Sequence, residues 1–300
     1  MIGKPYDISI FDIFKIGIGP SSSHTVGPMK AAAAFADLLN AENLDTQVAR
    51  IVIEVYGSLA LTGIGHGTFD ALLLGLEGSL PHDIPLADIP KRLERIRTQH
   101  VLKLNGREMT FNPEKDLDIR GDKVLPKHPN GLNFIAYNSD GQKLKEQIYY
   151  SVGGGFIVTD EGFAQEAQEN SDVPYPYKNC DELLAQCRLN QLNISEVVLA
   201  NEAALAGCDE VEVRRRVAAV ADVMENCIKR GLGAEGQLPG GLNVRRRAPQ
   251  LAAKLKVLRE SEIVNTQLWP MRAACGMTKP TTTAAAILIT PMARSKTCMA

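Results

Sequence analysis

A short segment near the N-terminus concentrates side chains that can bind an anion and move a proton. It runs from Gly17 to Pro28 and reads GIGPSSSHTVGP, so four hydroxyl groups and one imidazole fall within five consecutive residues. The alanine-rich stretch from Met29 to Leu39 is typical of a helix, and Pro28 suits a first helical turn. Free N–H groups and the dipole at a helix N-terminus favour an anion such as a carboxylate. The alternative is a polar helix cap with additional serines.

The histidines are the candidate acid–base groups. His24 lies inside the hydroxyl segment, and the second candidate lies in Gly65-His66-Gly67, where small neighbours let the imidazole approach a ligand. A neutral imidazole takes up a proton near physiological pH. A lone histidine between glycines is also common as a structural residue. His128 is interpreted first as a turn residue, and His82 and His100 carry no signal of function.

Several unusual strings occur in a fixed order along the chain. The hydroxyl segment follows ISIFDIFKIG at residues 8–17, and the later strings are YGSLALTGIGHGT at 56–68, YYSVGGGFIV at 149–158, VPYPY at 173–177 and LPGGL at 238–242. In these strings the chain resembles the iron–sulfur L-serine dehydratases, the bacterial L-serine ammonia-lyases that work without pyridoxal phosphate. The resemblance covers residues 5 to 260, approximately.

The resemblance implies conversion of L-serine to pyruvate and ammonia, a reaction of amino-acid degradation and gluconeogenesis. The α-proton must leave, and a Lewis-acidic iron of a 4Fe–4S cluster can carry away the β-hydroxyl. By this resemblance we expect His66 to transfer the proton and His24 to help bind the substrate. The substrate-binding residues expected around them are Ser21, Ser22, Ser23, Thr25 and Gly65. The complete enzyme is expected to be a homo-oligomer.

Composition places the chain among ordinary globular proteins. The 300 residues are 45% hydrophobic and 23% charged, with a net charge of −2, which gives no argument for nucleic acid or a membrane surface as partner. We find no signal peptide and no apolar run of membrane-spanning length, and therefore expect a cytoplasmic protein. The six cysteines match no zinc or ferredoxin spacing, which favours buried small side chains.

The first half of the chain has the pattern of a mixed α/β domain with two layers. A β-branched strand is expected at residues 48–56, and a glycine-rich turn then leads to an apolar helix. Further strands are expected at 109–111, 133–137 and 147–152, with a polar, exposed helix at 92–100. Gly153-Gly154-Gly155 indicates either a bulge or bend, or a close approach of the backbone to another group.

The second half changes to helices, which makes the predicted fold class α+β. Helices are expected at 181–189, at 195–205 with Asn193 or Ser195 as cap, at 209–230 and at 248–258. The predicted organisation is a serine dehydratase beta-type α/β domain at 1–160, a linker at 161–180, and an incomplete alpha-type helical catalytic domain at 181–262. Such a partial helical domain is expected to expose apolar faces and to self-associate.

Residues 263–300 form a divergent tail. It contains no acidic residue and has no match in the family, and Cys275 and Cys298 lie outside the family's ligand context. The cluster ligands are therefore not identified, and we expect a truncated chain whose tail is read out of frame. Arg245-Arg246-Arg247 is either an anion site or a solvated helix start, whereas Glu235 and Asn201-Glu202 are candidates for the site wall without an assigned place.

The leading hypothesis is a serine dehydratase polypeptide. The main alternative is a non-catalytic chain that binds a small molecule, or one subunit of a split enzyme whose partner brings the cluster. A third hypothesis is an unrelated anion-binding α/β protein. An autonomous enzyme needs three or more thiolates with open iron coordination, and these cysteines show no such set.

Overall fold

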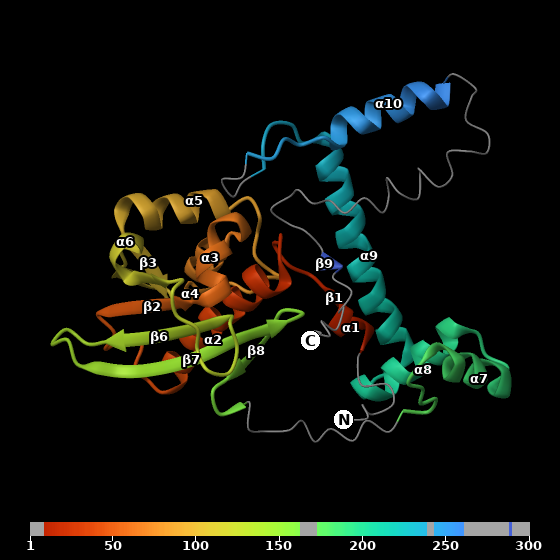
Figure 1. Ribbon diagram of the computed structural model, residues 1–300, viewed down its shortest axis with the longest axis horizontal. Coiled ribbons are helices and arrows are strands. Elements are labelled where there is room, and N and C mark those ends of the chain that lie inside the picture. The colour runs from red at the N-terminus through yellow and green to blue at the C-terminus, as the bar shows by residue number, and fades with distance from the viewer. Residues whose placement is uncertain (1–8, 163–172, 239–242, 261–287, 290–300) are drawn as a thin grey trace.

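The fold is a sheet covered by helices, followed by a mostly helical region (Figure 1). The structure, a computed structural model, describes residues 9–162, 173–238, 243–260 and 288–289. Its main sheet has five strands in the order β5-β2-β6-β7-β8. The strands are β2 (Arg50–Tyr56), β5 (Leu117–Arg120), β6 (Gly131–Tyr137), β7 (Lys143–Gly153) and β8 (Phe156–Thr159). Strands β2 and β5 are parallel, and the other neighbours are antiparallel.

The second layer is made of α2 (Gly27–Ala41), α3 (Gly57–His66) and α4 (Thr68–Leu76). Helix α2 carries Phe35 onto Phe134 of β6 with 5.2 Å between ring centroids, and Phe134 meets Tyr149 of β7 edge-on at 5.8 Å. Helices α2 and α4 approach closely because Gly75 has no side chain: a Cβ there would lie 2.3 Å from the carbonyl oxygen of Met29. The predicted two-layer α/β arrangement is confirmed.

The expected polar, exposed helix at 92–100 is present, and Glu94, Arg97, Thr98 and Gln99 are exposed on it. Residues 89–99 are helical, as α5 (Ile89–Glu94) and a π-helical turn η2 (Arg95–Gln99), but Leu93 and Ile96 are buried. Arg92 and Arg95 both bind the carboxylate of Glu77, which is itself buried. A buried carboxylate needs cationic partners, and these two half-buried arginines supply them. A small hairpin of β3 (Val101–Leu104) and β4 (Arg107–Thr110) and the short α6 (Pro113–Asp116) complete this part.

The three consecutive glycines form the turn between β7 and β8. Gly153, Gly154 and Gly155 have φ of +103°, +57° and +75°, a conformation that favours glycine. The turn also approaches α2 closely. A Cβ on Gly155 would lie 2.7 Å from the Cγ1 atom of Val26, and Lys30 Nζ donates a hydrogen bond to the Gly155 carbonyl at 3.0 Å. The glycines therefore serve a hairpin turn and a close approach, and the register of β7 on β8 shifts between Ser151 and Gly153, as a bulge or bend would produce.

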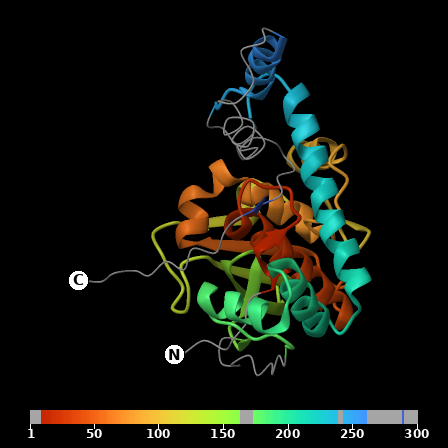
Figure 2. The ribbon, with the colours of Figure 1, turned by 90° about the vertical axis from the view of Figure 1, so that its right-hand side faces the viewer.

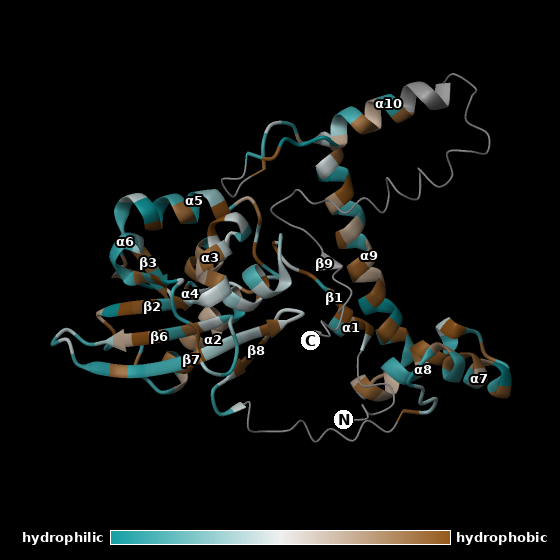
Figure 3. Ribbon diagram, in the orientation of Figure 1, coloured by the Kyte–Doolittle hydropathy of each residue, from teal (hydrophilic) through white to brown (hydrophobic). Residues whose placement is uncertain are grey.

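The helical region consists of α7 (Cys180–Asn190), α8 (Ile194–Ala206), α9 (Glu210–Gly233) and α10 (Ala248–Glu260). Asn193 caps α8 in a capping box, and Asp209 caps α9. Helix α9 stands beside the α/β part, and hydrophobic residues alternate with hydrophilic ones along it (Figures 2 and 3). Exposed apolar residues on it include Val211 and Leu232, as expected of a helical region with uncovered faces.

The first described residues lie between these two parts. Helix α1 (Ile10–Ile13) and strand β1 (Phe14–Lys15) stand between α9 and the α/β part (Figure 1). Strand β1 pairs with the two-residue strand β9 (Leu288–Ile289). The rest of the predicted divergent tail, with Cys275 and Cys298, lies outside the described residues.

The expectation of buried cysteines holds for only one of the four that are described. Cys227 on α9 is fully buried, whereas Cys180 is exposed and Cys187 and Cys208 are partly exposed. Of the three accessible ones, Cys180 and Cys187 lie in α7 and Cys208 follows α8. Within the described ranges, no single helix is long and apolar enough to cross a membrane; α3 and α4 reach that length and composition only together, across a 93° bend.

Candidate functional site

The hydroxyl segment is folded into the helix start itself. Ser22–Val26 form one π-helical turn, η1, that runs directly into α2, and Ser21 is its cap. The Ser21 Oγ atom accepts a hydrogen bond from the backbone N–H of His24 at 3.1 Å. The prediction placed the hydroxyls ahead of a helix beginning near Pro28. That position is corrected, because the helical hydrogen bonds already begin with Val26 N–H donating to the Ser21 carbonyl at 3.1 Å.

Pro28 determines what surrounds this turn. It has no N–H to donate to the carbonyl of Ser23, five residues earlier in the π-helical spacing, or to that of His24, four residues earlier. Both carbonyls accept side-chain hydroxyls instead. Ser151 Oγ on β7 donates to Ser23 O at 2.7 Å, and Thr68 Oγ1 on α4 donates to His24 O at 2.6 Å. These two hydrogen bonds connect the turn to strand β7 of the sheet and to helix α4, which follows His66.

His66 is the last residue of α3 and not part of a free glycine turn. Gly65 lies inside the helix, and Gly67, with φ of +63°, ends it in the left-handed conformation. The Nδ1 atom of His66 lies 3.0 Å from the carbonyl oxygen of Thr62. A carbonyl can only accept, so Nδ1 carries the hydrogen and the neutral ring has its lone pair on Nε2. The fold therefore fixes the tautomer of His66.

The two candidate histidines, 42 positions apart in sequence, are neighbours in space. Their ring centroids are 4.9 Å apart, with the planes tilted by 42°. Reciprocal hydrogen bonds hold the two segments together: Thr25 Oγ1 donates to the His66 carbonyl at 2.7 Å, and Thr68 Oγ1 donates to the His24 carbonyl. Both threonines are buried, which strengthens these bonds.

The His24 ring is held by two hydroxyls. Ser23 Oγ lies 2.9 Å from Nδ1, and Ser58 Oγ lies 2.9 Å from Nε2. Burial lowers the pKa of His24 below its ordinary value, and the neighbouring His66 lowers it further. Burial therefore favours the neutral ring of His24, the form that accepts a proton.

Ser58 was missed as a site residue. The signal that could have found it is the order strand, Gly57, Ser58, helix: β2 ends at Tyr56, and the chain turns at Gly57 with φ of +50°. This turn places Ser58 at the start of α3, beside the loop whose Pro129 carbonyl accepts its N–H at 3.2 Å. A polar residue where a buried strand meets a helix is a common position for a ligand group.

The predicted substrate-binding residues divide into two kinds. The hydroxyls of Ser21 and Thr25 bind the backbone, and Gly65 is helical, so these three shape the site. Ser23 contacts the His24 ring, and Ser22 is buried in the same turn. Their roles toward a substrate stay predictions. Lys30, in the first turn of α2, adds a half-buried cation, and burial followed by the charge of Lys15 lowers its pKa.

The other polar candidates lie outside the histidine pair. His128 Nδ1 accepts the N–H of Asn130 at 3.1 Å within its turn, and burial lowers its pKa. Asn201 and Glu202 are both buried on α8, where Asn201 binds the backbone of Tyr175 through both amide atoms. Their hydrogen bonds go to Tyr175, Ser9 and Ile10, and the idea that they line the site stays a prediction.

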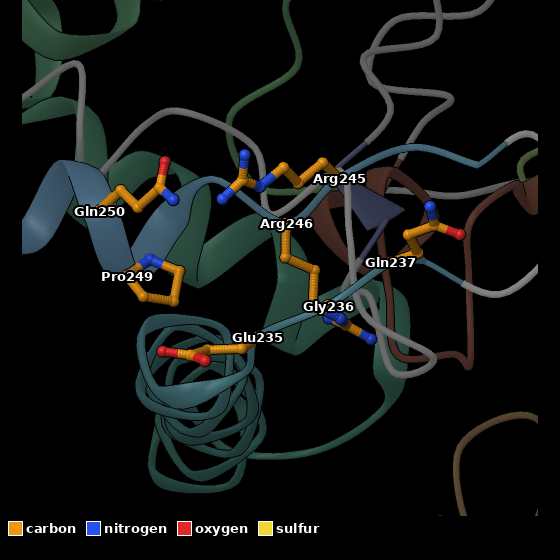
Figure 4. A pocket seen from close by; sticks show the side chains of 7 residues that line it. All are labelled: Glu235, Gly236, Gln237, Arg245, Arg246, Pro249 and Gln250. Atoms are coloured by element: carbon orange, nitrogen blue, oxygen red, sulfur yellow. The ribbon is translucent and has the colours of Figure 1, made fainter.

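A separate cleft lies where α9 ends and α10 begins (Figure 4). Its volume is about 330 Å³, and it is lined by Glu235, Gly236, Gln237, Arg245, Arg246, Pro249 and Gln250. Gln237 and Arg245 form an antiparallel bridge, and α10 starts at Ala248, directly after the three arginines. Arg245 and Arg247 are exposed, which agrees with a solvated helix start.

Comparison with known proteins identifies relatives of both parts of the chain. A family model described as the serine dehydratase beta chain matches residues 9–162. An L-serine dehydratase of Streptomyces coelicolor is 44% identical over 252 residues, which cover 83% of this chain and 55% of the relative. L-serine dehydratase 2 of Escherichia coli is 45% identical (83% and 54%), and an L-serine dehydratase of Helicobacter pylori is 39% identical (83% and 54%). The chain spans about half the length of these curated relatives. It belongs to the serine dehydratase beta-chain family.

Proposed function

We propose that this chain is an L-serine dehydratase polypeptide, which acts in the conversion of L-serine to pyruvate and ammonia. The observation that carries the proposal is the His24–His66 pair, fixed at 4.9 Å beside a hydroxyl-lined helix start. The names of the relatives support this reaction over a non-catalytic binding chain. The family match removes the third hypothesis, an unrelated anion-binding protein.

His66 is the proposed base for the α-proton of serine. Its Nδ1–H donates to Thr62 O, which leaves the Nε2 lone pair as the proton acceptor of the neutral ring. None of the described residues forms a hydrogen bond at that Nε2 atom.

His24 and the turn that carries it are proposed to bind the substrate. Neutral His24 and the hydroxyls of Ser23 and Ser58 offer hydrogen bonds that can be redirected, since each hydroxyl both donates and accepts. The N-terminus of η1 and α2 favours the substrate carboxylate. Lys30 adds positive charge on the same helix. The substrate amine and hydroxyl have no assigned partners.

The resemblance also implies a 4Fe–4S cluster, whose iron would act as a Lewis acid on the β-hydroxyl. The residues that the structure describes do not fit it. Among them, no group of three or more His, Cys, Asp or Glu side chains is placed to hold a metal ion. Cys227 is buried in α9, whereas Cys180 is exposed at the start of α7. Cysteines in such different surroundings do not form one ligand site. The roles proposed for the described residues are therefore binding and proton transfer alone.

The test is anaerobic release of pyruvate from L-serine by the purified chain after incubation with iron and sulfide. Because no group of the described residues could hold the cluster, the chain alone should release no pyruvate above a control without iron. In a full-length L-serine dehydratase, replacing the residue that matches His66 by Ala should abolish release, and replacing the residue that matches the exposed His82 should not. Circular dichroism verifies that each variant is folded. Equal rates for the full-length enzyme and its variant at the His66 position would contradict the proposed role of His66, and release by this chain alone would show that its own cysteines hold a cluster.

A further inference from the structure

The N-terminal segment of residues 9–18, here called the N-terminal link, joins the helical region to the histidine site. Its first residues bind α8. Ser9 Oγ donates to Glu202 Oε2 at 2.6 Å, and the backbone N–H of Ile10 donates to Glu202 Oε1 at 2.8 Å. The residues are 193 and 192 positions apart in sequence. On α9, the Arg216 guanidinium stacks over the ring of Phe11 at 3.9 Å.

The other end of the N-terminal link is packed against the α/β part. Lys15 Nζ lies 4.5 Å from the ring centroid of Phe156, the first residue of β8. Gly17 packs so closely on η1 (Ser22–Val26), here called the serine turn, that a Cβ would lie 2.6 Å from the Cγ2 atom of Val26. Three residues after buried Ile18, the chain enters the turn at its cap, Ser21. The N-terminal link thus contacts both parts of the protein, as its place in Figures 1 and 2 shows.

Glu202 gives the link a polar anchor that is fully withdrawn from water. Glu202 is 1% exposed, so its carboxylate depends on hydrogen bonds from the protein. A buried carboxylate that accepts an O–H and an N–H forms charge-assisted bonds, about twice as strong as neutral ones. The preceding residue, Asn201, holds the backbone of Tyr175 in the same way. Neighbouring residues of α8 therefore bind two segments that join the parts: Glu202 binds the N-terminal link, and Asn201 binds the backbone of Tyr175 ahead of α7.

We propose that Glu202 is a positioning residue, which fixes the helical region relative to His24 by holding the N-terminal link. The inference goes beyond the proposed function and does not depend on it. It predicts that loss of the Glu202 contact loosens the association of the two parts and disturbs the serine turn. Residues of the α/β part remote from the link stay unaffected.

The first experiment tests the association of the two parts. A protease site is introduced into the full chain between Gly162 and Val173, the chain is cleaved, and the two halves are followed by size-exclusion chromatography at decreasing concentration. The Asn201–Tyr175 contact stays within one half, whereas the buried Glu202 carboxylate binds Ser9 and Ile10 across the cut. Loss of its two hydrogen bonds in Glu202→Leu should raise the Kd between the halves by roughly tenfold to a hundredfold. An unchanged Kd would overturn the proposal.

The second experiment distinguishes positioning from general loss of stability. The imidazole resonances of the uncleaved chain are recorded by NMR. Glu202→Leu should shift the His24 resonance and leave that of His100 unchanged, because His100 follows η2, away from the link. Glu202→Gln, which retains an acceptor for the Ile10 N–H, should restore the wild-type spectrum. The matched control is Glu225→Gln, an exposed glutamate on α9 paired with Lys229.

A variant outside the helical region covers the case in which Glu202→Leu does not fold. Ser9→Ala removes one of the two hydrogen bonds and leaves α8 intact. It should shift the His24 resonance in the direction of Glu202→Leu by a smaller amount. A folded Ser9→Ala variant with unchanged His24 resonance and unchanged Kd between the halves would overturn the proposal.

Discussion

The hydrogen bond from Thr68 to the His24 carbonyl offers a sharp test of how the two histidine segments are held together. Thr68→Val keeps the size and branching of the side chain and removes only the hydroxyl. Thr68 is fully buried, and its Oγ1 lies 2.6 Å from an oxygen that Pro28 cannot serve. The variant therefore leaves a buried carbonyl without its donor, and we expect a loss of about 1–3 kcal/mol in the free energy of unfolding.

The matched control is Thr98→Val. Thr98 also donates to a helix carbonyl, that of Glu94 at 2.7 Å, but it is exposed and far from the site in sequence. Water can replace its hydrogen bond, so we expect a change within about 0.5 kcal/mol. Urea unfolding followed by circular dichroism measures both variants. If Thr68→Val lowers the free energy of unfolding no more than Thr98→Val does, the reasoning is refuted. The hydrogen bond to the His24 carbonyl, which Pro28 leaves without an N–H donor, would then not hold the two histidine segments together.

Two further predictions follow from the structure. Because burial lowers the pKa of His24 and His128 below 6.5, the folded state binds fewer protons than the unfolded state, and stability should fall as the pH falls below 6.5. Urea midpoints over a pH series should show this loss, and substitution of either histidine by Asn should reduce it; an unchanged slope in both variants would contradict the assignment. Gly155→Ala should cost about 1–3 kcal/mol more than Gly141→Ala, because both glycines have positive φ but only the first would crowd Val26. Equal losses would show that crowding at the turn is unimportant.

The elements could be predicted from the sequence because their signals are local. The long helix expected at 209–230 is α9, Glu210–Gly233, and its cap, Asp209, is directly readable from the acidic first turn. The β-branched run ending at Tyr56 is β2. Some strands are longer than the three to six residues expected from the sequence, as with β7, because pairing with neighbours extends a strand beyond its own sequence pattern.

The contacts that build the site could not be predicted, because they depend on residues distant in sequence. His24 and His66 were both identified, yet their contact depends on the reversal of the chain at Gly57 between β2 and α3. Glu202 and Ser9 are 193 positions apart in sequence, and no sequence pattern predicts their contact. The arginines at 92 and 95 look solvated until Glu77 is found buried beneath them. In each case tertiary packing decides which polar group is withdrawn from water.

The most direct test of the central claim is an NMR titration of the purified chain with L-serine, observed at the imidazole resonances. The claim is that serine binds beside the His24–His66 pair. It predicts saturable shifts of both resonances, loss of these shifts in Ser23→Ala/Ser58→Ala, and a constant His100 resonance. Constant His24 and His66 resonances at saturating L-serine, in a chain shown to be folded, would contradict the claim.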